Sequence, residues 1–225
     1  MTTRLRVSDI RSGYSSVWKH FSDAADAARL VVKASDGLGH KIVGEKKSIR
    51  VSALLYFSAW PSKSTSGKKK VDILVQADER FNGATGKIEK STTRVGYFEQ
   101  TTDGARPLLQ LHYDFETPVP AAHPVFHAQL GASTWPTQTL AELGFRTPIL
   151  VGADSLFGHH RIPTPFMGFG AALLAIAADH LEHDLYFGFL TAMRTNDCVL
   201  WSPACDGFLK SWTKHGGFPH SHHWY

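Results

Sequence analysis

The residues best suited to chemistry lie in the segment 108–131, where polar side chains alternate with apolar ones. They are Gln110, His112, Asp114 and Glu116, followed by His127 and Gln129. Successive side chains of a strand point to opposite faces, so this alternation predicts two strands with their polar residues on one face. Neither strand carries Lys, Ser or Thr on that face. This polar face is the first candidate site.

The two strands are separated by TPVPAAHP at 117–124, whose prolines predict a loop that closes a hairpin. The natural register of this hairpin sets Asp114 opposite His127 and His112 opposite Gln129. A slip of one residue would turn every side chain of one strand to the other face. The pairing is therefore a specific prediction that a structure can contradict.

Three interpretations of this face remain open. A carboxylate that orients an imidazole suits general acid–base catalysis, with His112 and His127 as acid and base and Asp114 orienting one of them. The same groups, with His123, could instead hold a divalent metal ion, although their spacing matches no zinc signature. The third interpretation is a solvated face, because antiparallel sheets often leave one polar face in water.

A second candidate is GHHRIPTP at 158–165, where Thr164 and Pro165 predict the start of a helix. The N-terminus of a helix offers unpaired N–H groups to an anion, and Arg161 could add a bidentate contact to phosphate. The alternative is an ordinary capped helix with a surface arginine.

Charge is distributed unevenly along the chain. Residues 1–100 hold 18 Lys and Arg against 10 Asp and Glu, whereas residues 101–225 hold 6 against 10 and also 11 of the 13 histidines. The segment 61–70 predicts a flexible basic loop that includes Lys68, Lys69 and Lys70. Such a loop could contact a nucleic acid or a phosphorylated ligand. Ordinary solvation of the lysines is the alternative.

The remaining pattern predicts the elements that position these residues. Apolar residues three and four apart predict a helix over 8–34, and a second helix is expected over 164–185. Strands are expected at 49–60, 71–78 and around 94–100, before the two of the hairpin. A helical turn at 139–143 and a short strand at 149–151 complete the pattern. The fold class is therefore α+β, with about five antiparallel strands covered by two helices in a single domain of residues 1–225.

Several absences and single residues limit the function. The chain has no P-loop, nucleophile elbow, HExxH or CxxC motif. Cys198 and Cys205 are expected to be reduced, buried thiols in a cytoplasmic protein without a membrane span. His180 falls on the apolar face of its helix and is expected to be a core histidine bonded to a neighbour. The segment 186–225 is aromatic and rich in His, so we expect it to pack on the domain.

Two functional hypotheses follow from these observations. One is a small hydrolase acting on a phosphodiester or nucleotide-like substrate, with the histidines and Asp114 catalytic, Arg161 and Gln129 binding the substrate, and a divalent metal as an optional cofactor. The other is a non-catalytic module that binds nucleic acid or protein through the basic segment. The sequence leaves the oligomeric state open.

Overall fold

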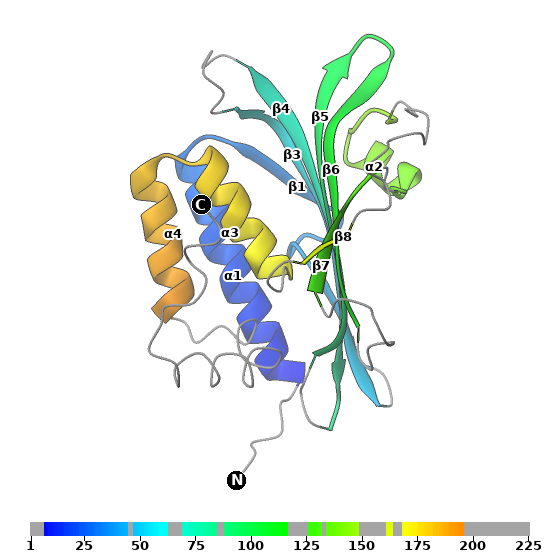
Figure 1. The fold of residues 1–225 in the computed structure, drawn as a ribbon. Helices are drawn as coiled ribbons and strands as arrows, with labels where there is room; N and C mark the ends of the chain where they lie inside the picture. The colour runs from blue at the N-terminus through cyan, green and yellow to red at the C-terminus, as the bar shows by residue number, and fades with distance from the viewer. Residues whose placement is uncertain are drawn as a thin grey trace.

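The protein is an antiparallel sheet with its three longest helices packed on one face (Figure 1). The computed structural model describes residues 7–44, 47–62, 69–84, 88–116, 126–131, 134–148, 161–163 and 168–195. Within these ranges the strands run in the order β1-β3-β4-β5-β6-β7-β8, and β2 also pairs with β3. All of these pairings are antiparallel. The predicted α+β class is therefore confirmed.

The sheet has eight strands rather than about five. The strands are β1 (Val31–Ala34), β2 (Lys41–Gly44), β3 (Ser48–Pro61), β4 (Lys70–Asn82), β5 (Ile88–Thr101), β6 (Gly104–Glu116), β7 (Phe126–Leu130) and β8 (Arg161–Pro163). The strands that the prediction missed, β1, β2 and β8, contain only three or four residues each. Segments this short contain too little alternation to be recognised. The predicted strand at 149–151 lies outside the described residues.

The first helix, α1 (Val7–Ala27), ends earlier than its periodicity predicts. The prediction of a helix to residue 34 is wrong, because Val31 begins strand β1 and pairs with Ser58 of β3. Arg29 ends the helix in a left-handed conformation with a φ of 56°. Glycine usually occupies such a position, so the sequence gives little warning of this end.

The second predicted helix is two helices, α3 (Phe169–His180) and α4 (His183–Thr195). The chain is extended at Leu181, with a φ of −83° and a ψ of 152°, so a continuous helix to residue 185 is wrong. His180 is 8% exposed, and its Nδ1 lies 2.6 Å from the carbonyl oxygen of Pro61. The prediction of a core histidine bonded to a neighbour is confirmed.

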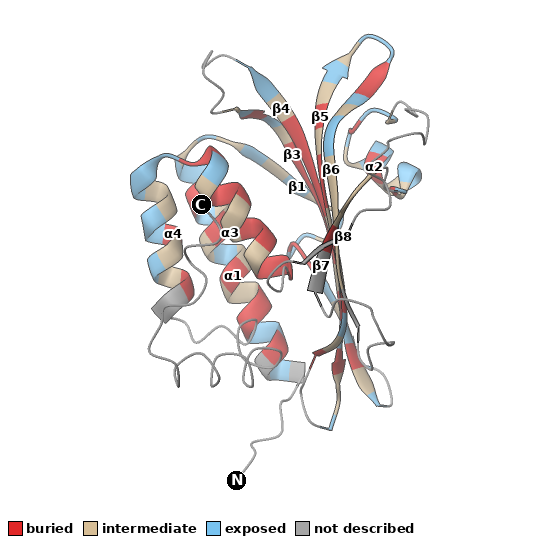
Figure 2. Ribbon diagram, in the orientation of Figure 1, coloured by how far each residue is buried: buried red, intermediate tan, exposed pale blue. Residues whose placement is uncertain are grey.

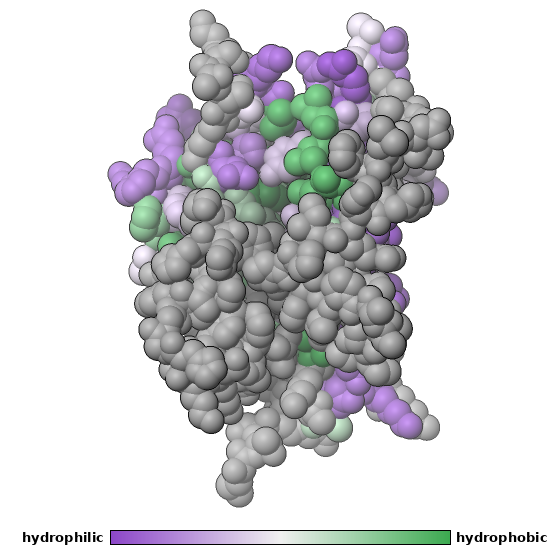
Figure 3. All heavy atoms as spheres, in the orientation of Figure 1, coloured by the Kyte–Doolittle hydropathy of each residue, from purple (hydrophilic) through white to green (hydrophobic). Residues whose placement is uncertain are grey.

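Two apolar clusters lie on opposite sides of the sheet. The larger one joins the inner face of the sheet to α1, α3 and α4, and its buried residues include Tyr14, Phe21 and Phe169. Figure 2 shows buried residues on α1, on α3 and on the long strands. The smaller one lies on the outer face beneath α2 (Thr137–Glu142), which falls near the predicted helical turn. The space-filling view shows apolar atoms at the surface in the upper part of the molecule, where Figure 1 draws the upper parts of the long strands (Figure 3). The chain therefore has an inner and an outer sheet face with separate environments.

A buried carboxylate fixes an irregular part of β3. The pairing of β3 with β4 shifts register between Phe57 and Trp60, where Ala59 has a positive φ of 55°. Asp72 of β4, which is 4% exposed, accepts hydrogen bonds from the Ala59 N–H at 2.7 Å and the Tyr56 hydroxyl at 2.8 Å. The Gln100 amide donates a third. Burial, with Asp72 as a smaller cause, raises the pKa of Tyr56 to about 12.

We expect Asp72→Asn to destabilise the protein by about 2 kcal/mol, because an amide nitrogen would replace one of the accepting oxygens and leave a buried donor unpaired. Urea denaturation measures the cost. The matched control is Asp78→Asn, whose carboxylate is 38% exposed and paired with Arg50, and this change should cost no more than about 1 kcal/mol. Equal costs for the two variants would contradict the assigned role of Asp72.

Candidate functional site

The outer face of the sheet carries two rows of polar residues that cross the strands. Residues directly opposite each other in antiparallel strands place their side chains on the same face. The His112 row consists of the successive Cα partners Gln76, Arg94, His112, Gln129 and Arg161 on β4 to β8. The Asp114 row, two residues along, consists of Asp78, Thr92, Asp114, His127 and Pro163. Residues that are far apart in the chain thus meet on one surface.

The predicted hairpin register is confirmed. Asp114 is the Cα partner of His127, and His112 is the Cα partner of Gln129. The side chains of His127 and Arg161 lie outside the described part of the structure, as does the whole of His123. These residues are therefore placed only by their position in the sheet, and Arg161 is two strands from His112 in the same row.

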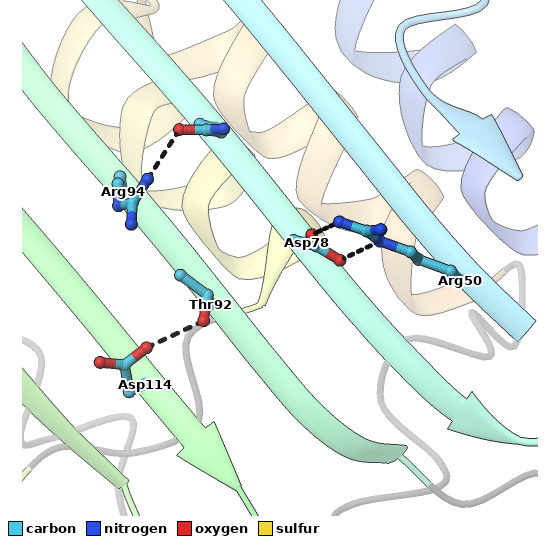
Figure 4. A network of polar contacts seen from close by, with 6 residues as sticks. Arg50, Asp78, Thr92, Arg94 and Asp114 are labelled. Carbon is cyan, nitrogen blue, oxygen red and sulfur yellow. Dashed lines mark hydrogen bonds and ion pairs between the residues drawn. The ribbon is translucent and has the colours of Figure 1, made fainter. Parts of the chain in front are cut away.

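His112 and Asp114 form the centre of the site. The His112 Nε2 lies 3.0 Å from the Asp114 Oδ1, and the two side chains are 27% and 32% exposed. The ring N–H does not point at this oxygen, so the contact is electrostatic and gains strength when the imidazole is protonated. The Thr92 hydroxyl donates a hydrogen bond of 2.9 Å to the same Asp114 oxygen (Figure 4). A half-buried carboxylate is thus held beside an imidazole.

Arg94 brings a positive charge next to His112, its Cα partner on β6. Its Nη1 donates to the Gln76 Oε1 at 3.1 Å (Figure 4). It also donates to the Thr134 carbonyl at 3.3 Å, and both acceptors are neutral. Arg50, by contrast, is neutralised by Asp78, with its Nε 2.9 Å from the Asp78 Oδ1. Among the contacts that the structure describes, Arg94 therefore keeps a charge that no carboxylate offsets.

The segment before α2 lies beside the His112 row, over Gly96 and Gln110 of the neighbouring strand positions. Trp135 is 6% exposed and donates its indole N–H to the Gln110 Oε1 at 2.9 Å. Its ring packs over Gly96, where an added Cβ would lie 2.8 Å from the Trp135 Cζ2. The preceding residue, Thr134, supplies the carbonyl that binds Arg94. The packing of Trp135 on Gly96 therefore helps to position Arg94.

The structure places Lys69 and Lys70 away from the polar rows. Lys69 and Lys70 are exposed, and Lys68 lies outside the described residues. Lys70 begins β4, six residues before Gln76 of the His112 row. Because a strand rises about 3.3 Å per residue, the two positions are about 20 Å apart. Lys70 and the His112 row thus lie at different positions along β4.

The second predicted site was an anion-binding helix N-terminus near Thr164, and the predicted start of that helix is wrong. The N-cap of α3 is Gly168, so the helix begins four residues later than the sequence suggests. The N–H of Phe169 donates to the Glu79 Oε1 at 2.8 Å, on the inner face of the sheet. This end of the helix therefore serves the core rather than the outer rows.

Three residues of the site, Arg94, Thr92 and Gln76, were not predicted from the sequence. The alternation of polar residues in β4 and β5 contained the signal, but only pairing across the strands reveals that these residues share a face with His112. The outer face as a whole also includes Thr92 and Lys90. The absence of Lys, Ser and Thr noted in the sequence is therefore a property of β6 and β7 alone. A polar, partly solvated surface surrounds the site.

The structure offers limited support for a metal centre. Within the described residues no group of three or more His, Cys, Asp and Glu side chains is placed to hold a metal ion. His112 and Asp114 supply two potential ligands, and a third would have to come from His123 or His127. The divalent metal remains a prediction.

Comparison with known proteins identified no relative of this chain. No family model, curated protein or solved structure matches this chain. None of the helices in the described ranges is long and apolar enough to cross a membrane.

We expect Gly96→Ala to destabilise the protein by about 2 kcal/mol, because the new Cβ would lie 2.6 Å from the Phe98 Cε2 and displace Trp135. Thermal unfolding measures this cost. The control is Gly188→Ala on α4, where a Cβ meets nothing within 4 Å and alanine favours the helix by about 0.5–1 kcal/mol. If both variants unfold at the wild-type temperature, Trp135 does not pack as described.

Proposed function

We propose that the chain is a phosphoester hydrolase that binds a phosphodiester or nucleotide-like substrate on the outer face of its sheet. The observation that carries this proposal is that Arg94 and His112 are Cα partners on neighbouring strands. The described hydrogen bonds of Arg94 go to neutral acceptors, and His112 is in contact with the Asp114 carboxylate. Phosphoester hydrolysis requires an anion-binding charge and an acid–base group side by side, and catalysis consists mainly of positioning and electrostatic stabilisation.

Each residue has a defined role in this proposal. Arg94 binds the non-bridging phosphate oxygens and offsets the negative charge that develops on them. His112 takes the proton from the attacking water, and Asp114 stabilises the imidazolium that results. The Thr92 hydroxyl holds Asp114 in place. The oxygen of water forms the new bond to phosphorus while the bond to the leaving oxygen breaks.

The leaving oxygen needs a proton, and His127 is the residue proposed to donate it. His127 is the Cα partner of Asp114, one strand away from His112. Gln129 and Arg161 continue the His112 row and are proposed to bind the rest of the substrate. A divalent metal, if bound by His112, Asp114 and a further histidine, would act as a Lewis acid on a phosphate oxygen.

The experiment is turnover of bis(p-nitrophenyl) phosphate and of a short single-stranded DNA, with EDTA and with added Mg²⁺, Mn²⁺ or Zn²⁺. We expect His112→Ala to lower kcat about 100-fold or more, the usual contribution of an acid–base group. Arg94→Ala should raise KM and lower kcat as well, because its charge acts on both the bound substrate and the transition state.

Matched controls separate these effects from general damage. His183→Ala removes a histidine that is 78% exposed on α4, and Arg106→Ala removes an arginine that is 58% exposed and paired with Glu99. Both controls should keep wild-type turnover. If folded His112→Ala and Arg94→Ala also keep it, the proposed site is wrong.

A binding module is the second candidate, supported by the exposed Lys69 and Lys70. Replacement of Lys68, Lys69 and Lys70 by Ala would then weaken DNA binding and flatten its salt dependence, while His112→Ala would leave binding intact. A chain that binds DNA in this way without any hydrolysis would favour the module over the hydrolase.

A further inference from the structure

Three positive side chains lie next to one another across β3, β4 and β5. Arg50 is the Cα partner of Arg80, and Arg80 is the Cα partner of Lys90. All three residues are exposed. Like charges directly opposite each other destabilise an antiparallel pair of strands, so three adjacent cations require an explanation. Arg50, Arg80 and Lys90 together form the basic row.

The basic row shares the outer face of the sheet with the proposed site. Lys90, Thr92 and Arg94 are alternate residues of β5, so their side chains point to the same face. The register shift between β4 and β5 lies on the far side of the Arg80–Lys90 pair and leaves this alternation intact. Figure 4 shows Arg50 and Arg94 on this face, with helices behind the sheet.

A path without a carboxylate joins the basic row to the site along β5. Lys90 precedes Arg94 by four residues, and because a strand rises about 3.3 Å per residue the two positions are about 13 Å apart. Thr92 is the one residue of β5 between them on this face. On β6, by contrast, the Cα partner of Lys90 is Glu116. A polyanion that extends from Arg94 to the basic row would therefore follow β5.

Two carboxylates offset part of the repulsion within the basic row. Arg50 is paired with Asp78, and the Arg80 Nε lies 3.6 Å from the Glu89 Oε2. The side chains of Arg80 and Glu89 are 46% and 33% exposed. Ion pairs between exposed side chains contribute little to stability, so a phosphate can take the place of either carboxylate at small cost.

The separation of the basic row from Arg94 suits a substrate with several phosphates in line. About four nucleotides cover a distance of about 13 Å in duplex geometry, where the rise is about 3.4 Å per nucleotide, and an extended strand needs fewer. A mononucleotide or a simple diester bound at Arg94 would leave the basic row without a ligand. The row therefore fits a longer polyanion.

We propose that the substrate is a nucleic-acid strand that lies along β5, with one phosphate at Arg94 and neighbouring phosphates on the basic row. This choice of substrate rests on the hydrolase function proposed above. The basic row is a nucleic-acid-binding surface independently of that function.

The first test is the binding of a labelled single-stranded oligothymidylate, measured by fluorescence anisotropy in a His112→Ala background so that the strand is not cut. We expect Arg80→Gln with Lys90→Gln to weaken binding about tenfold near physiological salt, the counterion release of two phosphate contacts. The slope of log Kd against log salt concentration should also fall by about 1.4.

The matched control is Lys19→Gln with Arg106→Gln, which removes the same two residue types and the same charge elsewhere. These side chains are 69% and 58% exposed. Both double variants change exposed residues and should stay folded, which circular dichroism checks. The control should keep the affinity and the salt slope of its parent. Equal losses in the two double variants would overturn the basic row.

Strand length tests the geometry. In the protein with His112 intact, kcat/KM should be higher for an oligothymidylate that reaches from Arg94 to the basic row than for a thymidine dinucleotide, which has one phosphodiester. Arg80→Gln with Lys90→Gln should lose this gain, and Lys19→Gln with Arg106→Gln should keep it. A gain that survives in the basic-row variant would contradict the proposed path along β5.

Two outcomes separate the substrate from the function. Hydrolysis of bis(p-nitrophenyl) phosphate, together with oligothymidylate binding that is insensitive to Arg80 and Lys90, would overturn the basic row alone. Binding that depends on these residues, without hydrolysis of either substrate, would overturn the hydrolase and support the basic row as a binding surface.

Discussion

Direct antiparallel pairing of the long central strands is the constraint on which the rest of the structure depends. Each of β3, β4, β5 and β6 has 13 or 14 residues, and each pairs with the next strand along most of its length. Because paired residues share a face, alternation within one strand becomes a row across several strands. The same pairing that buries Val75 and Val95 under the helices therefore brings Arg94 beside His112.

The sequence predicted those features that depend on local alternation. The hairpin of β6 and β7 and its register were correct, because a polar row and a proline-rich loop leave little freedom in how the strands pair. The strands at 49–60 and 71–78 were also found, since β-branched and aromatic residues there have no helical period. The fold class followed from these elements.

Other features depend on tertiary contacts that local patterns do not encode. Val31 continues the helical period of α1, yet pairing with β3 makes it the start of a strand. The break at Leu181 has no glycine or proline to mark it. Arg94 became part of the site only through pairing, and the start of α3 is set by Glu79, a residue 90 positions away in the chain. Long-range pairing and burial thus determine these helix ends and this part of the site, which local sequence patterns do not predict.

The register shifts in the sheet have a consequence for its shape. They lie at Phe57–Trp60 in β3, near Arg80–Phe81 between β4 and β5, and at Tyr97–Phe98 between β5 and β6. Such bulges bend a strand and increase its twist, and all three lie to either side of the two polar rows rather than within them. Curvature around the helices is therefore taken up towards the strand ends. The middle of the sheet stays regular, so a residue inserted at one of the bulges would leave the spacing of His112 and Asp114 unchanged.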